Sequence, residues 1–320
     1  MPKPGGGEVL VEVGVAGLCR TDLKLIEQGH RDLILPRVPG EEVVGYVRAV
    51  GKGVDESWIK KRVYLYPGTS CGHCRSCRHG AGNLCVSMRI MGFHRDGGFA
   101  DYVVAPESCL IAVPERLDFD AAVFAEPLSC CLNAIERADP QSGDRALLFG
   151  AGPAGTLLAR VLSFLGVDVT IVEPDERRRV RAGALAEAPS AMFDIVIPAV
   201  GDESVLDQSL ERLAPRGRLV VFSGLSPNAA VRPIDVNRLH YLEQTVVGAY
   251  GCSYRHGVTA IKWLAAGSIK VDDMISHRLP LTQLDTALDI VRTRTGMKVL
   301  LYPSGYMFNS TVSTTQDKDS

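Results

Sequence analysis

Hydrophobic and polar residues alternate at the start of the chain, and this pattern predicts β-structure. Valine occupies every second position from Val9 to Val15, so one face of this predicted strand is buried. Short β-rich runs follow at residues 43–50 and 62–66, with Gly and Pro between them. The first part of the chain is therefore expected to consist mostly of strands.

The hydrophobic pattern changes near residue 145. An apolar run (ALLFG) leads into a glycine-rich turn (GAGPAG), a segment of helical spacing (AGTLLARVLSFLG) and a second apolar run (VTIVE). Two further apolar runs, DIVIPAVG and RLVVFSG, enclose a helix-like segment at 204–214, and residues 255–266 form another amphipathic helix. Strands that alternate with helices predict an α/β region with a parallel, doubly wound sheet.

Length, composition and charge narrow the class of protein. The 320 residues suffice for two domains, and 46% hydrophobic with 22% charged residues is a globular composition. A net charge of −2 provides no basic field for nucleic acid or an anionic membrane, and no apolar run is long enough to span a bilayer. The N-terminal residues do not resemble a signal peptide. We expect a cytoplasmic protein whose partner is a small molecule.

Four of the nine cysteines have the spacing of a metal site. The pattern C-x2-C-x2-C-x7-C brings four soft ligands into one loop, and these are Cys71, Cys74, Cys77 and Cys85. Four thiolates fill the tetrahedral shell of zinc, so this predicted structural site, in a lobe at 67–90, holds a loop and performs no chemistry. The alternative is a set of free thiols. An odd number of cysteines with metal spacing favours a reducing cytosol over a disulfide framework.

The glycine-rich turn fits the dinucleotide-binding pattern G-x-G-x-x-G. Gly150 allows the tight turn, Gly152 lets the backbone approach a pyrophosphate, and Gly155 lets the helix pack on the strand. Pro153 lies within the motif, where the helix begins and its N–H groups face the phosphates. The alternative is a glycine-rich turn without a ligand.

An acidic residue ends the strand that follows this helix. Glu173 lies 18 residues beyond Gly155, where a carboxylate accepts hydrogen bonds from the ribose hydroxyls of NAD and repels the 2′-phosphate of NADP. The arginines at 177–179, with Arg178 assigned to the cofactor, either flank the adenine or bind that phosphate. The position of Glu173 favours NAD; the alternative is a solvated acid at a strand end.

Together these motifs resemble the zinc-dependent medium-chain dehydrogenases, the superfamily of alcohol and polyol dehydrogenases. The similarity runs from about residue 4 to residue 303 and includes EVLVEVGVAGLCRTD, PGEEVVG, the four-cysteine lobe, GGFADYVV, AEPLS and GAGPAG. The resemblance implies a mostly-β, GroES-like catalytic domain at 1–128 and 251–303 and a Rossmann domain at 129–250. The tail at 304–320 is expected to be disordered.

The resemblance also implies a second, catalytic zinc in the cleft between the domains. Cys19 and Glu126 match two of the family's usual ligands, and a glutamate at the latter position is similar to the sorbitol, threonine and glucose dehydrogenase branch. Where the family has Gly-His-Glu, this chain has Glu41 in place of the histidine. With these three ligands the site has a net charge of −1, and its metal is a weaker Lewis acid. The alternative is that Glu41 does not bind and the site is weak or empty.

Further roles follow from matching motif positions. Thr21 matches the hydroxyl that relays the substrate proton, although a threonine beside Asp22 also suits a helix cap. Asp22 is expected to orient the metal ligands, and Glu42 matches the acid behind the zinc, which could itself become a ligand. Lys298 matches a cation that faces the pyrophosphate; the alternative is a solvated lysine at a strand start.

The nicotinamide is expected at the ends of the fourth and fifth strands of the cofactor sheet, near Val200, Gly201, Ser223 and Gly224. Only residues 174–193, which number 20, separate Glu173 from Asp194, too few for the usual helix, strand and helix. We therefore predict that the third strand of this sheet is missing or vestigial. Pro198 is unusual in a central strand, because it cannot donate to the ladder. Relative to the family, we also expect the first strand of the catalytic domain to be absent.

These observations predict an oxidoreductase that transfers a hydride between a secondary alcohol, such as a polyol or sugar, and NAD. Two alternatives are a degenerate zinc- and dinucleotide-binding protein without activity, and a lyase or epimerase that keeps NAD tightly bound. The resemblance implies a homodimer or homotetramer that pairs through residues 245–250. Cys130 and Cys131 are interpreted as buried apolar filler.

Overall fold

The computed structural model describes residues 1–30 and 32–304, and strands from the first part of the chain form a seven-stranded sheet together with two strands from its end. Strand β1 lies at the centre of this sheet and pairs on its two sides with strands from both ends of the chain. The path runs β13 (Ile275–Pro280), β14 (Lys298–Tyr302), β1 (Glu8–Leu18), β2 (Glu42–Val50), β3 (Arg62–Leu65) and β7 (Leu110–Ala112), and β6 (Tyr102–Pro106) also pairs with β1. The predicted mostly-β domain is confirmed, and residues 275–302 belong to it.

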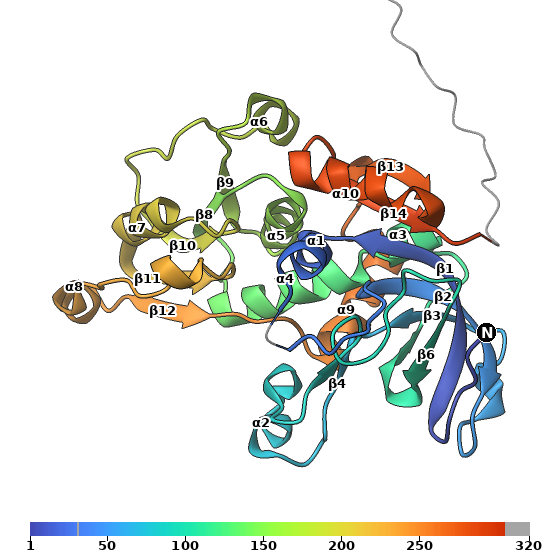
Figure 1. Cartoon of the computed structure of the whole chain (residues 1–320). Helices are drawn as coiled ribbons and strands as arrows, with labels where there is room; N and C mark the ends of the chain where they lie inside the picture. The colour runs from blue at the N-terminus through green and yellow to red at the C-terminus, as the bar shows by residue number, and fades with distance from the viewer. Residues whose placement is uncertain (31, 305–320) are drawn as a thin grey trace, which may run out of the picture.

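Helices surround this sheet, and a small lobe projects from it (Figure 1). The helices are α1 (Arg20–Gln28), α3 (Phe119–Ala122), α9 (Tyr254–Ala265) and α10 (Leu284–Thr293). The lobe contains β4 (Gly68–Thr69), α2 (Arg75–Arg78) and β5 (Arg89–Ile90), and it carries the four-cysteine motif.

The second sheet is parallel and has five strands. Its order is β12 (Thr245–Gly248), β11 (Leu213–Val221), β10 (Phe193–Pro198), β8 (Arg145–Phe149) and β9 (Asp168–Val172). Its helices are α4 (Ala125–Ala138), α5 (Pro153–Phe164), α6 (Glu176–Ala182), α7 (Glu203–Glu211) and α8 (Val236–Tyr241). The prediction of a doubly wound sheet is confirmed.

The third strand of this sheet is reduced to a single bridge. Between β9 and β10 the described chain forms only α6 and an isolated parallel bridge from Val172 to Leu185. The shortage of residues seen in the sequence therefore has the predicted consequence. Pro198 is the last residue of β10, where the lack of an N–H interrupts nothing, and the next residue, Ala199, still donates to Phe149.

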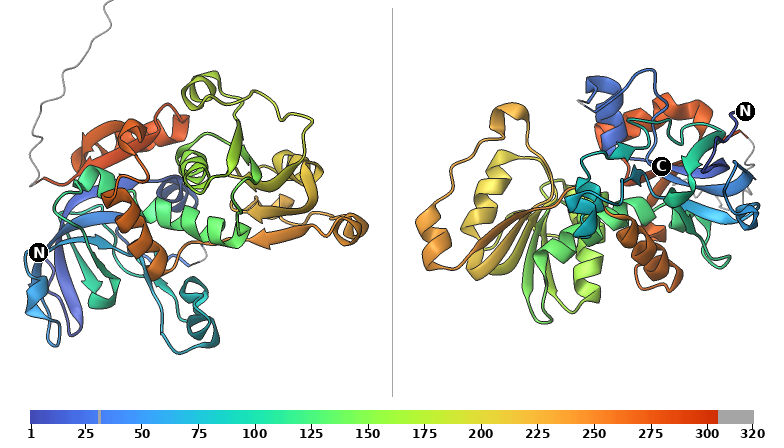
Figure 2. Two further views of the ribbon diagram at one scale, coloured as in Figure 1. Left: turned by 180° about the vertical axis from the view of Figure 1, so that it is seen from behind. Right: turned by 90° about the horizontal axis from the view of Figure 1, so that it is seen from below.

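The two sheets lie on opposite sides of α4, which joins their cores (Figures 1 and 2). One continuous hydrophobic cluster includes Tyr64 of the catalytic domain, Leu128 of α4, and Leu157 and Ile195 of the cofactor domain. The domain boundary expected after residue 128 thus falls inside α4. This helix presents residues to both domains, so it can hold a reaction centre between them. Residues 305–320, which include most of the predicted disordered tail, lie outside the described residues.

Candidate active site

The four cysteines of the lobe meet as their spacing predicts. The sulfur atoms of Cys71, Cys74, Cys77 and Cys85 all lie within 4.8 Å of one another. Cys74 and Cys77 are 3.5 Å apart and Cys71 and Cys77 4.0 Å, close to the sulfur–sulfur edge of about 3.8 Å that Zn–S bonds of about 2.3 Å produce in a tetrahedron. Backbone N–H groups of Cys77 and Val86 lower the pKa of Cys74 to about 6, which favours the thiolate. The donor set fits a structural zinc.

The glycine turn has the shape that a dinucleotide requires. Gly150 has φ +102°, and a Cβ at Gly155 would lie 1.9 Å from the Gly150 carbonyl oxygen, so neither position accepts a side chain. Gly152 is the N-cap residue of α5 and faces open space, and Pro153 is the first residue of the helix. The predicted strand–turn–helix context is confirmed.

Glu173 is buried and tied to this turn. Its carboxylate accepts hydrogen bonds from the backbone N–H of Ala151 at 2.8 Å and of Asp175 at 3.0 Å, and it pairs with Arg178 at 2.9 Å. The alternative of a solvated acid is therefore wrong. A carboxylate has about four acceptor positions, so about one remains for a ribose hydroxyl. Arg178 lies against Glu173, which offsets part of its negative charge.

The residues expected around the nicotinamide come together at the carboxyl ends of β10 and β11. Val200 and Gly201 follow β10, and Ser223 and Gly224 follow β11. A Cβ on Gly201 would lie 2.4 Å from the Gly224 carbonyl oxygen, so the two loops are in direct contact. Val200 also packs on the glycine turn, because its Cγ1 would lie 2.8 Å from a Cβ at Gly150.

Cys19 begins α1 and serves as its cap. Its Sγ accepts a hydrogen bond from the Asp22 backbone N–H at 3.3 Å, and its own N–H donates to Asp22 Oδ2 at 2.9 Å. Asp22 is buried and fixes Cys19, which agrees with the orienting role expected for it. Thr21 is exposed in the first turn of α1 and is not the cap residue, so the alternative of a capping hydroxyl is wrong.

Glu41 is positioned by a glycine pair from a distant part of the chain. Gly98 N–H donates to the Gly40 carbonyl at 3.0 Å, and Phe99 N–H donates to Pro39 at 3.0 Å. Gly40 has φ +105°, and a Cβ there would lie 2.8 Å from the Phe99 ring. The GGF segment at 97–99 therefore fixes the loop that carries Glu41. The sequence showed the motif but not this contact.

The cluster of acids around Cys19, in which Asp22 and Glu42 are buried and Glu41 and Glu126 are half-buried, suits a divalent cation. Burial raises the pKa of Asp22 to about 6 and that of Glu126 to about 7, with Glu42 adding to both, and the pKa of Glu41 is raised by burial and by Glu126. Burial also raises the pKa of the Cys19 thiol. Asp22 Oδ1 is buried without a hydrogen-bond partner. Carboxylate and thiolate donors that are costly to ionise alone are stabilised by a bound cation.

Glu42 and Lys298 form a buried ion pair behind Cys19. Their side chains are 1% and 3% exposed, and Lys298 also lies 5.9 Å from the centre of the Phe124 ring. Burial lowers the pKa of Lys298, but the charges of Glu42 and Cys19 outweigh burial and raise it overall. Gly17 makes room for the pair, because a Cβ there would lie 1.9 Å from Glu42 Oε2. The alternative of a solvated lysine is wrong, because Lys298 is buried and pairs with Glu42. The contact of Lys298 with the pyrophosphate stays a prediction.

The three predicted catalytic ligands do not form a closed set. Among residues 1–30 and 32–304, the donor atoms of Cys19, Glu41 and Glu126 are not found together within 4.8 Å, whereas those of Glu126, Cys130 and Cys252 are. The interpretation of Cys130 as apolar filler is wrong, because its Sγ lies 3.4 Å from Glu126 Oε1. Cys131 is fully buried, as expected for a filler.

Cys252 was missed because it stands alone in the sequence. A readable signal existed for Cys130, since Glu126 and Cys130 are four residues apart and share one face of a helix. Cys252 follows β12, and only the folded chain brings it to α4.

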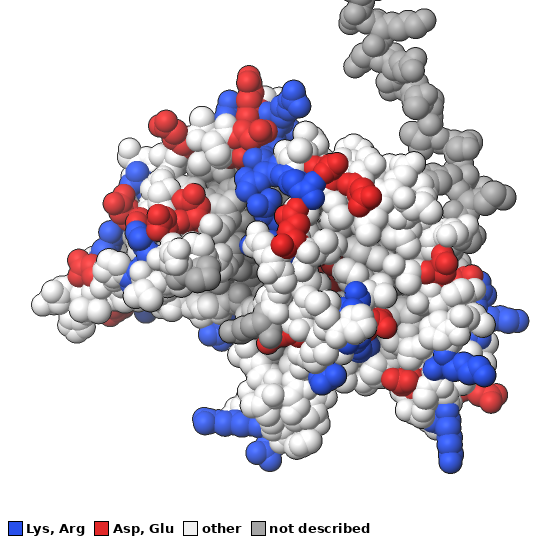
Figure 3. Space-filling view, viewed as in Figure 1, with Lys and Arg blue, Asp and Glu red and all other residues white. Residues whose placement is uncertain are grey.

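Charged side chains of both signs are interspersed over the face seen in Figure 3, with basic side chains gathered over α5 and α6. A cavity of about 750 Å³ lies here, lined by Arg160, Arg178, Arg181 and Lys270 among others. None of the predicted metal ligands lines it, so this cavity is separate from the acidic cluster. No helix in the described part of the chain is both long and apolar enough to cross a membrane.

Comparisons with known proteins agree with this arrangement. Residues 5–115 match the alcohol dehydrogenase GroES-like domain, and residues 154–266 match the zinc-binding dehydrogenase domain. The chain is 32% identical to D-altritol 5-dehydrogenase of Agrobacterium fabrum, and the match covers 87% of each chain.

Two solved structures are also similar to this chain. RspB of Escherichia coli CFT073, described as an alcohol dehydrogenase complexed with NADH, has a TM-score of 0.87 and 29% identity, covering 94% of this chain and 93% of that one. A candidate zinc-binding dehydrogenase of Sinorhizobium meliloti, bound to NADP, has a TM-score of 0.86 and 29% identity, covering 94% of each chain.

Proposed function

Because this chain belongs to the zinc-dependent medium-chain dehydrogenases, which oxidise alcohols, we propose that it oxidises a secondary alcohol of the polyol or sugar class with NAD. Its similarity to a D-altritol dehydrogenase supports a polyol substrate. The buried Glu173, directly after β9, supports NAD over NADP.

The observation that carries this proposal is the position of α4 between the acidic cluster and the glycine-rich turn. Glu126 and Cys130 lie on α4 within the acidic cluster, and the neighbouring Cys131 places its Sγ 3.6 Å from the Ala154 carbonyl of the glycine-rich motif. One helix therefore joins the cation-binding cluster to the dinucleotide turn. Oxidation of an alcohol by NAD needs this proximity, since donor carbon and acceptor ring must come into contact.

Each residue has a definite task in this reaction. Cys19, Glu41 and Glu126 provide the proposed ligand set for a catalytic zinc, which when bound supplies a Lewis acid that polarises the substrate hydroxyl. Asp22 holds Cys19 in place through two hydrogen bonds. Thr21 is exposed beside Cys19, where its hydroxyl takes the substrate proton toward solvent.

The cofactor is oriented by the two ends of its site. The glycine turn and the start of α5 receive the pyrophosphate, and the loops of Gly201 and Gly224 receive the nicotinamide. The remaining acceptor position of Glu173 receives a ribose hydroxyl. Lys298 adds positive charge on the side of the cleft where Glu42 and Cys19 lie.

The test measures formation of reduced nicotinamide with zinc-loaded protein, altritol and other polyols, sugar acids and threonine. The proposal expects turnover with at least one polyol and faster turnover with NAD than with NADP. Glu173→Gln keeps an acceptor for the Ala151 N–H and removes the charge, so the preference for NAD should fall roughly tenfold, as expected for loss of about 1.4 kcal/mol of discrimination. Absence of turnover with every alcohol would refute the proposed activity.

We further propose that the protein is a cytoplasmic homo-oligomer. All nine cysteines are free thiols in the structure, which suits a reducing compartment. Strand β12 lies at the edge of the parallel sheet, where a second copy of the strand can pair with it. Sedimentation analysis tests this, and a monomer at micromolar concentration would refute it.

A further inference from the structure

One cluster of metal-binding side chains lies outside the set expected from the family. The donor atoms of Glu126, Cys130 and Cys252 lie within 4.8 Å of one another, and Cys252 is 6% exposed. Glu126 Oε1 and Cys130 Sγ are 3.4 Å apart. With Zn–S bonds of about 2.3 Å and Zn–O bonds of about 2.0–2.2 Å, a tetrahedral site requires a sulfur–oxygen edge of about 3.5 Å. This edge is therefore already formed.

The helix and the segment that carry these ligands are fixed to each other. Glu126, Cys130 and Asn133 follow one another along a single face of α4. The Asn133 side chain donates to the Gly251 carbonyl at 2.9 Å, and the Tyr66 hydroxyl donates to the Cys252 carbonyl at 2.7 Å. Two side chains therefore hold the backbone at Cys252, whose Sγ lies within 4.8 Å of Cys130 Sγ.

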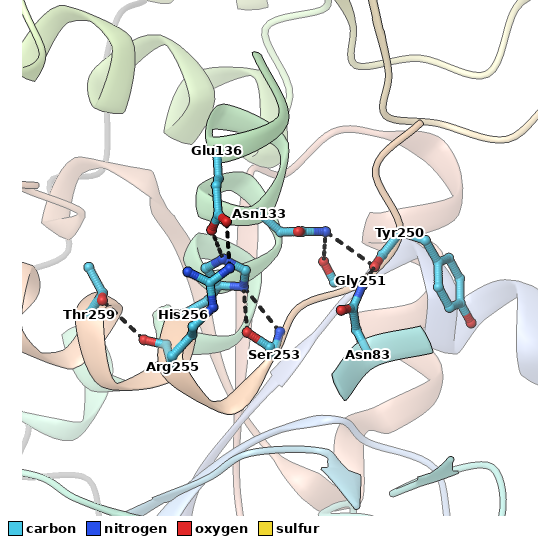
Figure 4. A network of polar contacts seen from close by, with 9 residues as sticks. All are labelled: Asn83, Asn133, Glu136, Tyr250, Gly251, Ser253, Arg255, His256 and Thr259. Carbon is cyan, nitrogen blue, oxygen red and sulfur yellow. Dashed lines mark hydrogen bonds and ion pairs between the residues drawn. The ribbon is translucent and has the colours of Figure 1, made fainter. Parts of the chain in front are cut away.

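A second contact fixes the same segment just beyond Cys252 (Figure 4). The ring of His256 lies 2.8 Å from Glu136 Oε2 through Nε2, and its Nδ1 accepts the Ser253 backbone N–H at 3.1 Å. Arg255 also pairs with Glu136. The segment 250–256 is thus anchored to α4 at Asn133 and at Glu136. Ligands on a prefixed backbone bind a metal without the cost of ordering them.

A buried hydroxyl beside the cluster also lacks a partner. Tyr64 is fully buried, and its hydroxyl makes no hydrogen bond. Burial raises the pKa of this hydroxyl, and the charges of Cys252, Glu126 and Cys130 add to the shift, so the hydroxyl lies within electrostatic reach of the cluster. Three protein ligands leave the fourth position of zinc open, and a water or hydroxyl there would offer Tyr64 a partner.

We propose that Glu126, Cys130 and Cys252 form a zinc site that shares Glu126 with the Cys19–Glu41–Glu126 set, and that zinc prefers this site in the conformation described here. Two thiolates and one carboxylate are softer ligands than one thiolate and two carboxylates, and zinc favours the softer set. This proposal depends on the proposed function in one respect, which is that the cleft binds an exchangeable metal ion.

The test replaces exchangeable zinc by Co²⁺ under reducing conditions, with zinc retained in the lobe, and records the thiolate-to-cobalt charge-transfer absorption. Its intensity increases with the number of bound thiolates. Cys130→Ser and Cys252→Ser should each lose about half of the absorption and bind Co²⁺ roughly tenfold or more weakly, since even outer partners of a metal site matter by about 10–100-fold. The matched control Cys131→Ser, one residue along the same helix, should change neither value, and Cys19→Ser should also keep the absorption.

Absorption that is lost in Cys19→Ser but kept in Cys130→Ser and Cys252→Ser would overturn the proposal. Absorption that is unchanged in all three of these variants would overturn it as well. If the serine variants do not fold, anomalous scattering at the zinc edge from wild-type crystals decides the matter. A zinc peak bonded to Cys130 and Cys252 supports the site, and a peak bonded to Cys19 alone overturns it. Turnover of a polyol is measured separately, so failure of the enzyme function and failure of this site remain distinguishable.

Discussion

Replacing Lys298 by methionine should remove the positive half of the buried ion pair with Glu42. The two side chains are 3% and 1% exposed, so water cannot solvate the remaining carboxylate without rearrangement. Removing one partner of a buried pair costs about 3–5 kcal/mol of unfolding free energy. At about 2–4 °C per kcal/mol, this corresponds to a fall of roughly 6–20 °C in the melting temperature.

A double variant distinguishes the cost of the unpaired charge from the cost of lost packing. The double variant Glu42→Met with Lys298→Met removes both charges and fills the space with apolar groups, and such replacements are often neutral. It should regain more than half of the stability that the single variant loses. Lys262→Met, at an exposed position of α9, is the matched control and should leave stability unchanged.

Urea unfolding of the zinc-loaded protein without cofactor measures all four proteins. A loss below about 1 kcal/mol in Lys298→Met would show that the pair is solvated, against the reasoning from burial. A double variant as unstable as the single one would show that packing, and not the unpaired carboxylate, sets the cost.

Three further outcomes are expected. Gly155→Ala should weaken NAD binding roughly tenfold or more and lower stability, since its Cβ meets the Gly150 carbonyl. Gly152→Ala, which faces open space, should weaken NAD binding but keep stability. Calorimetric titration measures the binding of NAD to both variants, and thermal melting measures their stability. Cys85→Ser should lose one zinc per chain by elemental analysis, while Cys109→Ser should lose none. Metal-free protein should lose stability as pH rises from about 4 through 7, because burial raises the folded-state pKa of Asp22 to about 6 and of Glu126 to about 7. Glu126→Gln should remove up to roughly 3 kcal/mol of this loss. A pH dependence of urea unfolding that is the same in wild type and variant would contradict this role of Glu126.

Local spacing in the sequence was sufficient for features that are built locally. The four lobe cysteines lie within 15 residues, and the glycine turn within six, so their patterns predict their geometry. The reduced third strand was also predictable, because the number of residues between Glu173 and Asp194 limits what the chain can form.

Contacts across long sequence separations were not predictable from pattern. Lys298 reaches Glu42 because β1 pairs with both β14 and β2, which places Leu18 opposite Val299 and Gly17 opposite Glu42. Cys252 reaches α4 because β12, which precedes it, packs against that helix. Registers of this kind depend on the whole sheet, and a motif in one segment does not encode the side chain that another segment brings to it.

Helix capping shows a third kind of limit. The position beside Asp22 suited Thr21 as a cap, since hydroxyls are common caps, yet the thiol of Cys19 takes that place. The N-cap lies two residues earlier than the hydroxyl of Thr21 would indicate, and this leaves Thr21 in the exposed first turn of α1.

The most direct test of the proposed chemistry follows deuterium from the alcohol carbon of the best polyol substrate into the cofactor. Zinc-loaded protein is incubated with the labelled polyol and NAD, and the reduced nicotinamide is analysed by mass spectrometry. We predict that reduced nicotinamide accumulates and carries the deuterium, since the hydride passes directly from carbon to ring. If no reduced nicotinamide accumulates while an epimer or dehydrated product forms, the protein is a lyase or epimerase and not a dehydrogenase.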